Sequence, residues 1–290
     1  MKTKKRFKGS KLSLLFMLMF VIVLAGCGND EASPATGSSG TSGGQEASEN
    51  IDTIAAIKER GKVIAGVKYD TRLFGLKDPI SGNVEGFDID MAKALAKKIL
   101  GDETKVELKE VTSKTRTPLL QNGEIDIIIA TMTITEDRKK EVDFSDVYFN
   151  AGQSLLVAKG SPITGIDSLN ADTTVLAVKG STSVTNIKEK APDAKVLEFE
   201  NYQEAFTALK ANKGDVLTTD NSILLGMMQD DPNYEMVGDI FTDEPYGMAI
   251  RKGDQQMVDT VNEMLQEMKD SGEYDELYEK WLGTSPPSAE

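Results

Sequence analysis

The stretch GFDIDMAKALAKKIL at residues 86–100 decides the fold class of this 290-residue chain. From Ile89 onward its apolar side chains recur every three or four residues, which predicts a helix with one buried face that ends at Gly101. Apolar runs with the length of buried strands flank it at 62–68, 105–110 and 125–130. A second helix is predicted at 117–122. This alternation of strand and helix predicts a mostly parallel sheet of the α/β class.

The same alternation starts again after Gly160. It predicts strands at 174–178, 195–199 and 215–218, and helices near 184–190, 202–211 and 222–229. Two consecutive units of this kind predict two lobes, and ligands of such sheets bind at the carboxyl ends of the strands. The cleft between the lobes is therefore the predicted site. Residues 255–282 predict two amphipathic helices that break near Ser271 and Gly272 and cover one lobe.

The composition excludes several kinds of chemistry. Histidine is absent and cysteine occurs once, which excludes Ser-His-Asp and Cys-His catalysis, His- or Cys-rich zinc sites and internal disulfides. The net charge of −14 disfavours nucleic-acid binding, because an acidic surface repels phosphates. We therefore predict no catalytic residue, no metal and no cofactor.

The N-terminus predicts an exported and anchored protein. A basic segment precedes an apolar run at 12–24, which is shorter than the roughly 20 residues that span a bilayer. The run ends in Leu24-Ala25-Gly26-Cys27, which resembles the bacterial lipobox and places the single cysteine at the lipidation position. We expect 1–26 to be a lipoprotein signal peptide. Residues 27–50 then comprise the lipidated Cys27 and a flexible Gly- and Ser-rich tether.

Several sequence blocks resemble the family 3 solute-binding proteins of polar amino acid ABC transporters. They are GFDIDM at 86–91, DIIIATMTITEDRKK at 126–140 with VDFS at 142–145, VKGSTS at 178–183 and WLGT at 281–284. The resemblance covers 51–284 and implies a two-lobed periplasmic-binding-protein, or Venus-flytrap, fold. It implies hinge crossings near 152–155 and 246–249. Lobe 1 would then comprise 51–153 plus 248–290, and lobe 2 would comprise 154–247.

A free amino acid offers a carboxylate, an ammonium and a side chain, and the sequence has a candidate for each. An arginine fork matches a carboxylate, and the resemblance implies that Arg138 binds the ligand α-carboxylate. Thr131, Thr133 and Ser183 can add hydroxyl and backbone N–H donors. Asp220 follows a strand, where the family has an acidic residue that accepts from the ligand ammonium, with Thr131 as a second acceptor. A helix cap is the alternative role of Asp220.

The side-chain pocket is predicted at the ends of the strands. Lys68 and Arg116 are the cations expected there. Two cations would favour an acidic side chain and hence glutamate or aspartate, because a neutral amide leaves excess charge, and glutamine is the alternative. The other expected contributors are the wall residues Tyr69 and Phe74 and the turn residues Lys179 and Ser181.

The predicted protein is a monomeric substrate-binding subunit on the extracytoplasmic face of the bacterial cell membrane. Its partners would be a small-molecule amino acid, the ABC permease and ATPase subunits, and the membrane through the N-terminal lipid. Alternatives of another class are a binding-protein-like dehydratase, a surface sensor or an adhesin. Many carboxylates are present, but they show no pattern that separates a general acid from a base.

Overall fold

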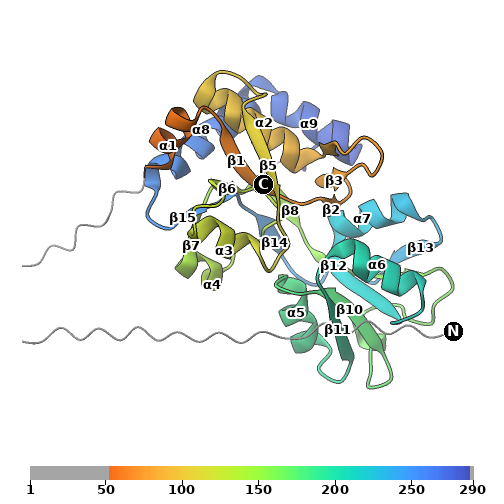
Figure 1. The fold of residues 1–290 in the computed structure, drawn as a ribbon. Coiled ribbons are helices and arrows are strands. Elements are labelled where there is room, and N and C mark those ends of the chain that lie inside the picture. Colours follow the sequence, from red (N-terminus) through yellow and green to blue (C-terminus); the bar gives the residue numbers. More distant parts are fainter. Residues whose placement is uncertain (1–51, 288–290) are drawn as a thin grey trace, which may run out of the picture. The chain divides into compact units, whose positions relative to one another are not determined.

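Two five-stranded sheets form the framework of the chain, and the computed structural model describes residues 52–287 (Figure 1). The first sheet has the strand order β5 (Val106–Glu110), β1 (Val63–Val67), β6 (Ile127–Ile128), β15 (Ala249–Arg251) and β7 (Val142–Phe144). β1 pairs in parallel with β5 and β6, whereas β15 is antiparallel to β6 and β7. One strand of this sheet therefore comes from the C-terminal part of the chain.

The second sheet repeats this plan. Its strand order is β11 (Lys195–Phe199), β10 (Thr174–Val178), β12 (Val216–Asp220), β9 (Gln153–Ala158) and β13 (Tyr234–Val237). β10 is parallel to β11 and β12, and β9 is antiparallel to β12 and β13. The predicted α/β class with two sheet-containing lobes is confirmed.

The chain crosses between the sheets twice, through a two-stranded ribbon. β8 (Phe149–Ala151) leads from β7 into β9, β14 (Glu244–Tyr246) leads from β13 back to β15, and the two pair antiparallel. The predicted crossings near 152–155 and 246–249 begin at the ends of these two strands. The proposed division of the chain into lobes at these positions stays a prediction.

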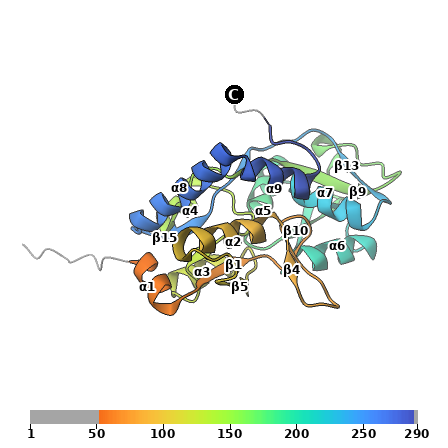
Figure 2. The same ribbon diagram turned by 90° about the horizontal axis from the view of Figure 1, so that it is seen from above.

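Helices cover both faces of the first sheet. α1 (Thr53–Arg60), α2 (Phe87–Leu100), α8 (Gln255–Ser271) and α9 (Glu273–Leu282) contact one another and bury one core (Figure 2). α3 (Arg116–Gln121) packs on the other face, against β1, β6 and β15. The side chains of a strand point alternately to the two faces of the sheet. In β1, Val63 and Ala65 point into the first core, and Ile64 packs against the second. The predicted break between the last two helices is confirmed at Gly272, where φ is 84°.

The second lobe is layered in the same way. α6 (Tyr202–Lys210) and α7 (Asn221–Asp230) pack with Leu156 on one face, and α5 (Thr182–Lys190) packs with Leu155 and Val157 on the other. Smaller elements complete the described residues. They are α4 (Glu136–Glu141), a 3-10 turn at Ile166–Ser168, and the three-stranded sheet of β2 (Asp70–Thr71), β3 (Gly75–Lys77) and β4 (Val84–Glu85).

Most predicted elements are confirmed, and one strand is wrong in extent. The strands at 174–178 and 195–199 form as predicted, but only Ile127–Ile128 of the strand predicted at 125–130 joins the ladder. It ends early because Thr131 has a left-handed φ of 45° and because the guanidinium of Arg116 takes the carbonyls of Ala130 and Thr131. The short antiparallel strands were not predicted, since their pairing depends on partners far away in sequence.

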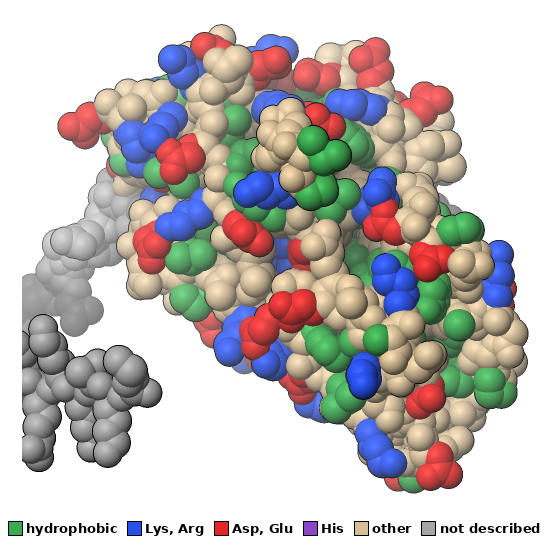
Figure 3. Space-filling model, turned by 45° about the vertical axis from the view of Figure 1, so that its right-hand side comes forward, with side chains coloured by type: hydrophobic (Ala, Val, Ile, Leu, Met, Phe, Trp, Pro, Cys, Tyr) green, Lys and Arg blue, Asp and Glu red, His purple; other side chains and the backbone are tan. Residues whose placement is uncertain are grey.

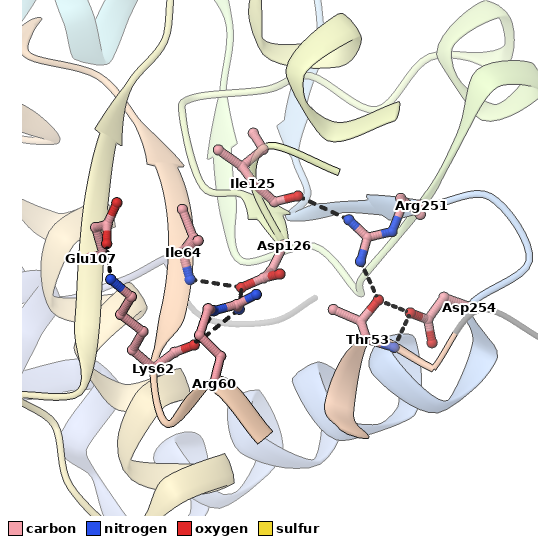
Figure 4. Close-up of polar contacts among 9 residues, drawn as sticks. All are labelled: Thr53, Arg60, Lys62, Ile64, Glu107, Ile125, Asp126, Arg251 and Asp254. Atoms are coloured by element: carbon pink, nitrogen blue, oxygen red, sulfur yellow. Dashed lines mark hydrogen bonds and ion pairs between the residues drawn. The ribbon is translucent and has the colours of Figure 1, made fainter. Parts of the chain in front are cut away.

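A polar network fastens α1 to the end of the first sheet that lies opposite the predicted site (Figure 4). Arg60 forms an ion pair with the buried Asp126. Arg251 Nη2 donates to Thr53 Oγ1 at 2.7 Å, and the same hydroxyl bonds to the carboxylate of Asp254. The helix that begins the described chain is thereby held firmly to its lobe.

None of the helices between residues 52 and 287 is long and apolar enough to cross a membrane. The predicted signal peptide, Cys27 and the tether lie outside the described residues. Acidic and basic side chains are mixed over the face drawn in Figure 3.

Candidate functional site

The predicted ligand residues lie at the carboxyl ends of strands in both lobes. Lys68 follows β1 and Thr131 follows the β6 region in the first lobe. Ser183 lies in the first turn of α5, after β10, and Asp220 ends β12 in the second lobe. These four side chains are at most 5% exposed. Burying a polar group is costly, so a cluster of buried polar side chains at facing strand ends is a candidate ligand site.

Three contacts bring the lobes together around these residues. They are Arg138 Nη2 to the Gly180 carbonyl at 3.1 Å, the Tyr202 N–H to Asp70 Oδ2 at 2.7 Å, and an ion pair between Arg72 and Asp230. The strand ends of the two lobes therefore face each other at close range.

Four buried side-chain atoms within residues 52–287 have no hydrogen-bond partner. They are Arg116 Nε, Thr131 Oγ1, Ser183 Oγ and Asp220 Oδ1, and all four belong to predicted ligand residues. An unsatisfied buried polar group costs about 1–3 kcal/mol, so folded proteins rarely keep one unless a function requires it. Two donors or acceptors from each lobe are thus available to a small polar ligand.

The guanidinium of Arg138 bridges the lobes. Its Nη1 donates to the Thr133 carbonyl at 2.7 Å, and its Nη2 donates to the Gly180 carbonyl. Burial lowers its pKa, while the carboxylates of Glu244 and Asp220 oppose that shift. Gly180 has a φ of 79°, and a Cβ there would lie 2.8 Å from the Ser113 carbonyl of the other lobe. The glycine therefore permits a close approach of the two lobes.

Thr131 is held in a strained backbone conformation from two sides. Its N–H donates to Asp88 Oδ2 at 3.0 Å, and its carbonyl accepts from Arg116 Nη1 at 3.3 Å. Asp88 Oδ1 also accepts from the Tyr148 hydroxyl at 2.8 Å. Burial raises the pKa of Asp88 to about 7 despite these hydrogen bonds. The contacts fix Thr131 with its hydroxyl unpaired, and such fixed strain is typical of ligand sites.

Asp220 has the position and the environment expected of an ammonium acceptor. Its Oδ2 accepts from the Tyr246 hydroxyl at 2.5 Å, and its other oxygen has no partner. Burial and the nearby Glu244 raise its pKa to about 7. The alternative role as a helix cap is not seen, because the side chain makes no capping bond to α7.

The two predicted pocket cations are buried but already have partners. Lys68 Nζ donates to Ser113 Oγ at 3.1 Å and lies 4.9 Å from the centre of the Tyr202 ring. Burial lowers its pKa to about 8, and Asp70 opposes that shift. Burial also lowers the pKa of Arg116 to about 9. Arg116 Nη1 donates to a backbone carbonyl, and its Nε has no hydrogen-bond partner.

Four other predicted pocket residues make contacts within the protein, and their role in the ligand pocket stays a prediction. Lys179 forms an ion pair with Glu200 and is partly exposed. Ser181 Oγ donates to the Val178 carbonyl at 2.7 Å, and the Tyr69 hydroxyl donates to the Leu108 carbonyl at 2.9 Å. Phe74 packs in the aromatic core, with its ring centre 6.0 Å from that of Tyr246. Spacing along the chain identified these residues, but it does not show which way a side chain points.

The sequence missed several residues that support the site. They are Asp88, Tyr148, Gln153, Asn186, Tyr202, Glu244 and Tyr246. Asp88 lies inside the quoted block at 86–91, but nothing in the sequence shows that the fold buries its carboxylate beside the Thr131 N–H. Glu244 gave no signal, because its strand is three residues long.

Acids lie among the cations of this cluster. The cations are Lys68, Arg116 and Arg138, and the acids are Asp88, Asp220 and Glu244. Asp70, which is partly exposed, adds negative charge next to Lys68. The two predicted pocket cations are therefore not unopposed, because the fold places acids beside them that a count of cations along the sequence leaves out.

The sequence model of one protein family, the bacterial extracellular solute-binding proteins, family 3, matches residues 63–284. The chain belongs to this family. The resemblance seen in the sequence blocks is thereby confirmed, and the position of the site between the lobes agrees with a protein that captures a small solute. In the solute-binding protein, no group of three or more potential metal-ligating side chains occurs within the described range.

Two relatives are similar over most of their length. The ABC transporter glutamine-binding protein of Bacillus subtilis (strain 168) is 59% identical, with 94% of this chain and 96% of that protein covered. The glutamine-binding protein of Geobacillus stearothermophilus is 60% identical, with coverage of 82% and 90%. The glutamate-binding protein of Corynebacterium glutamicum is more distant, at 33% identity and coverage of 80% and 82%.

Solved structures agree with the fold. An ancestral arginine-binding protein bound to glutamine is 45% identical with a TM-score of 0.73, and covers 78% of this chain and 99% of its own. The solute receptor for L-cysteine of Neisseria gonorrhoeae is 35% identical with a TM-score of 0.76, with coverage of 80% and 94%. The solute-binding protein thus shares its two-lobed architecture with proteins of several ligand specificities.

Proposed function

We propose that this solute-binding protein captures L-glutamine and delivers it to the permease of an ABC importer. The observation that carries the proposal is that the fold places Asp88, Asp220 and Glu244 among the cations Lys68, Arg116 and Arg138, so these cations are not an unopposed charge that requires an acidic side chain. The two relatives near 60% identity, both named for glutamine, point the same way. Glutamine, the alternative in the sequence argument, thus replaces glutamate and aspartate as the proposed ligand.

The α-carboxylate would bind at the first turn of α5 and Arg138. Arg138 has three N–H donors beyond the two that it spends on carbonyls, and Ser183 Oγ is unpaired. The carbonyl of Thr133 accepts a hydrogen bond from Arg138 Nη1 and so orients the guanidinium. A guanidinium and a helix N-terminus together are well suited to a carboxylate.

The ammonium would bind to Asp220 Oδ1 and Thr131 Oγ1, one from each lobe. Both atoms are buried acceptors without a partner, so an ammonium would satisfy them at once. Because the two atoms belong to different lobes, ligand binding stabilises the closed arrangement. We expect the ligand-free protein to populate an open state that closes when glutamine binds.

The side-chain amide would lie near Lys68 and Arg116. Arg116 Nε is an unpaired donor for the amide oxygen, and the Lys68 ammonium is an additional donor nearby. A glutamate carboxylate would accept the same bonds, but it would bring a further negative charge among the acids that the fold places near these cations. Glutamine and glutamate are thus distinguished by charge more than by shape.

The cellular setting follows from the N-terminal sequence. We propose that Cys27 is lipidated and that the residues up to 50 tether a monomeric binding domain to the outer face of the cell membrane. The partners would be the permease and ATPase subunits of the importer. The role includes no catalytic step, and the reported relatives are named as binding proteins.

Isothermal titration calorimetry of residues 28–290 with glutamine, glutamate, aspartate and arginine tests the proposal. We expect glutamine to bind at least tenfold more tightly than the other three. Tighter binding of glutamate, or no binding of any amino acid, would overturn it. Small-angle scattering with and without saturating glutamine tests closure, because the radius of gyration should fall when the ligand binds.

A further inference from the structure

An aromatic ring of the second lobe contacts a cation of the proposed side-chain pocket. Lys68 Nζ lies 4.9 Å from the centre of the Tyr202 ring, which is within the range of a cation–π contact. Lys68 follows β1 in the first lobe, and Tyr202 is the first residue of α6 in the second. The two residues are 0% and 3% exposed. The contact therefore lies between the lobes, out of reach of bulk water.

This contact differs from the other cation–π contacts of residues 52–287. In the other four the lysine is exposed, and both partners belong to one lobe. They are Lys77 with Tyr69, Lys210 with Phe206, Lys269 with Tyr274, and Lys280 with Trp281. A cation–π contact is stronger when the cation is removed from water. The contact between Lys68 and Tyr202 is thus the strongest candidate for a functional role.

The Lys68 ammonium keeps donors for a ligand. It donates to Ser113 Oγ at 3.1 Å, in its own lobe. Burial lowers its pKa to about 8, so it is protonated at pH 7. An ammonium has three N–H donors, and the lysine stem has four rotatable bonds. A fixed neighbour is therefore needed to direct the remaining donors.

Tyr202 is such a neighbour, because it is held at both ends. Its backbone N–H donates to Asp70 Oδ2 at 2.7 Å, across the lobes. Its hydroxyl accepts from Thr219 Oγ1 at 3.3 Å, directly before Asp220 on β12. The ring is thus fixed relative to the strand ends of both lobes.

We propose that Tyr202 is a positioning residue for recognition of the ligand side chain. When the lobes close, its ring holds the Lys68 ammonium where the remaining donors face the side-chain oxygen of the ligand. In the open state the ring is withdrawn, and the ammonium is free to turn away. This inference deepens the proposed function and rests on it, since that proposal places the side-chain amide near Lys68.

The test separates recognition of the amide from closure of the lobes. L-Norvaline keeps the side-chain methylenes of glutamine but ends in a methyl group, so it cannot accept from Lys68. The ratio of the dissociation constants for norvaline and glutamine, measured by displacement calorimetry, should fall about fivefold or more in Tyr202→Leu. A substitution that only loosened the closed state would weaken both ligands alike and leave the ratio unchanged.

Three further variants show whether the ring acts through Lys68. The conservative variant Tyr202→Phe loses only the hydroxyl bond with Thr219, so its ratio should stay within about twofold of wild type. Phe206→Leu removes the ring of another cation–π contact on the same helix and should leave the ratio unchanged. Lys68→Met removes the ammonium, so adding Tyr202→Leu to it should lower the ratio no further. Should Tyr202→Leu fail to fold, Tyr202→Met also lacks the ring and should show the same fall.

The outcomes distinguish this inference from the function on which it rests. A wild-type protein that binds glutamate more tightly than glutamine refutes the proposed ligand. The ratio is then measured with glutamate, whose carboxylate would meet the same ammonium. With either ligand, an unchanged ratio in folded Tyr202→Leu or Tyr202→Met refutes the role of Tyr202. An equal fall in Tyr202→Phe or Phe206→Leu also refutes it, because loss of the ring beside Lys68 would then not be the cause.

Discussion

Replacing Arg138 by alanine should nearly abolish glutamine binding while leaving the protein folded. The side chain donates to the carbonyls of Thr133 and Gly180 and has three further N–H groups for the ligand carboxylate. Leaving a buried carboxylate without its cation costs about 3–5 kcal/mol, or between two and nearly four decades in Kd. Arg138→Lys keeps the charge but not the planar fork. It should lose about 1.5–3 kcal/mol, which is one to two decades.

The assay is calorimetric titration with glutamine, accompanied by circular dichroism and thermal denaturation to establish that each variant is folded. Lys140→Ala is the matched control, because this exposed cation lies on the same short helix and pairs only with Asp137. Its removal should change the affinity by less than twofold. A folded Arg138→Ala protein with wild-type affinity, or an equal loss in Lys140→Ala, would refute the assignment of the carboxylate site.

Three further changes probe the ammonium site, the closure of the lobes and the anchor. Asp220→Asn should weaken glutamine binding at least tenfold. The pKa of Asp220 is raised to about 7, so its contribution to the stability of the ligand-free protein is present below about pH 4 and lost as the pH rises through about 7. The melting temperature should therefore fall less between pH 5 and pH 8 in the variant than in the wild type. Equal falls in melting temperature would contradict this. Gly180→Ala places a Cβ 2.8–2.9 Å from backbone atoms of Ser113 and Lys114 in the other lobe. It should weaken the binding of every ligand, and the radius of gyration should stay large with glutamine present. A variant that becomes compact and binds tightly would show that this close approach of the lobes is not needed. Cys27→Ser should release the protein into the medium with unchanged affinity, whereas retention in the membrane fraction would indicate an uncleaved signal.

Much of the secondary structure could be predicted because it depends on local pattern. The helix over Phe87–Leu100 has a strict apolar period, and its left-handed cap at Gly101 is a residue that tolerates a positive φ. The strands Thr174–Val178 and Lys195–Phe199 are short apolar runs between turn residues. Such patterns depend only on residues close in sequence, so they can be recognised without knowledge of the fold.

The types of site residue could also be predicted, but not their electrical surroundings. Arg138, Thr131, Ser183 and Asp220 follow strands, and α/β topology brings strand ends to one place. Four of the residues named from sequence carry the unpaired buried atoms. The sequence could not show that Lys179 points toward Glu200, because side-chain direction depends on the local turn.

The sequence by itself determined the α/β class, the two lobes, the family and the strand-end residues that surround the ligand, because periodicity and motif spacing are properties of neighbouring residues. Only the tertiary structure decided the charge of the site. Asp88 lies beside Thr131, 43 positions away, and Glu244 lies beside Thr182, 62 positions away. Charges act through space and not along the chain, so a count of cations near strand ends favoured glutamate, and the acids that the fold brings among them favour glutamine.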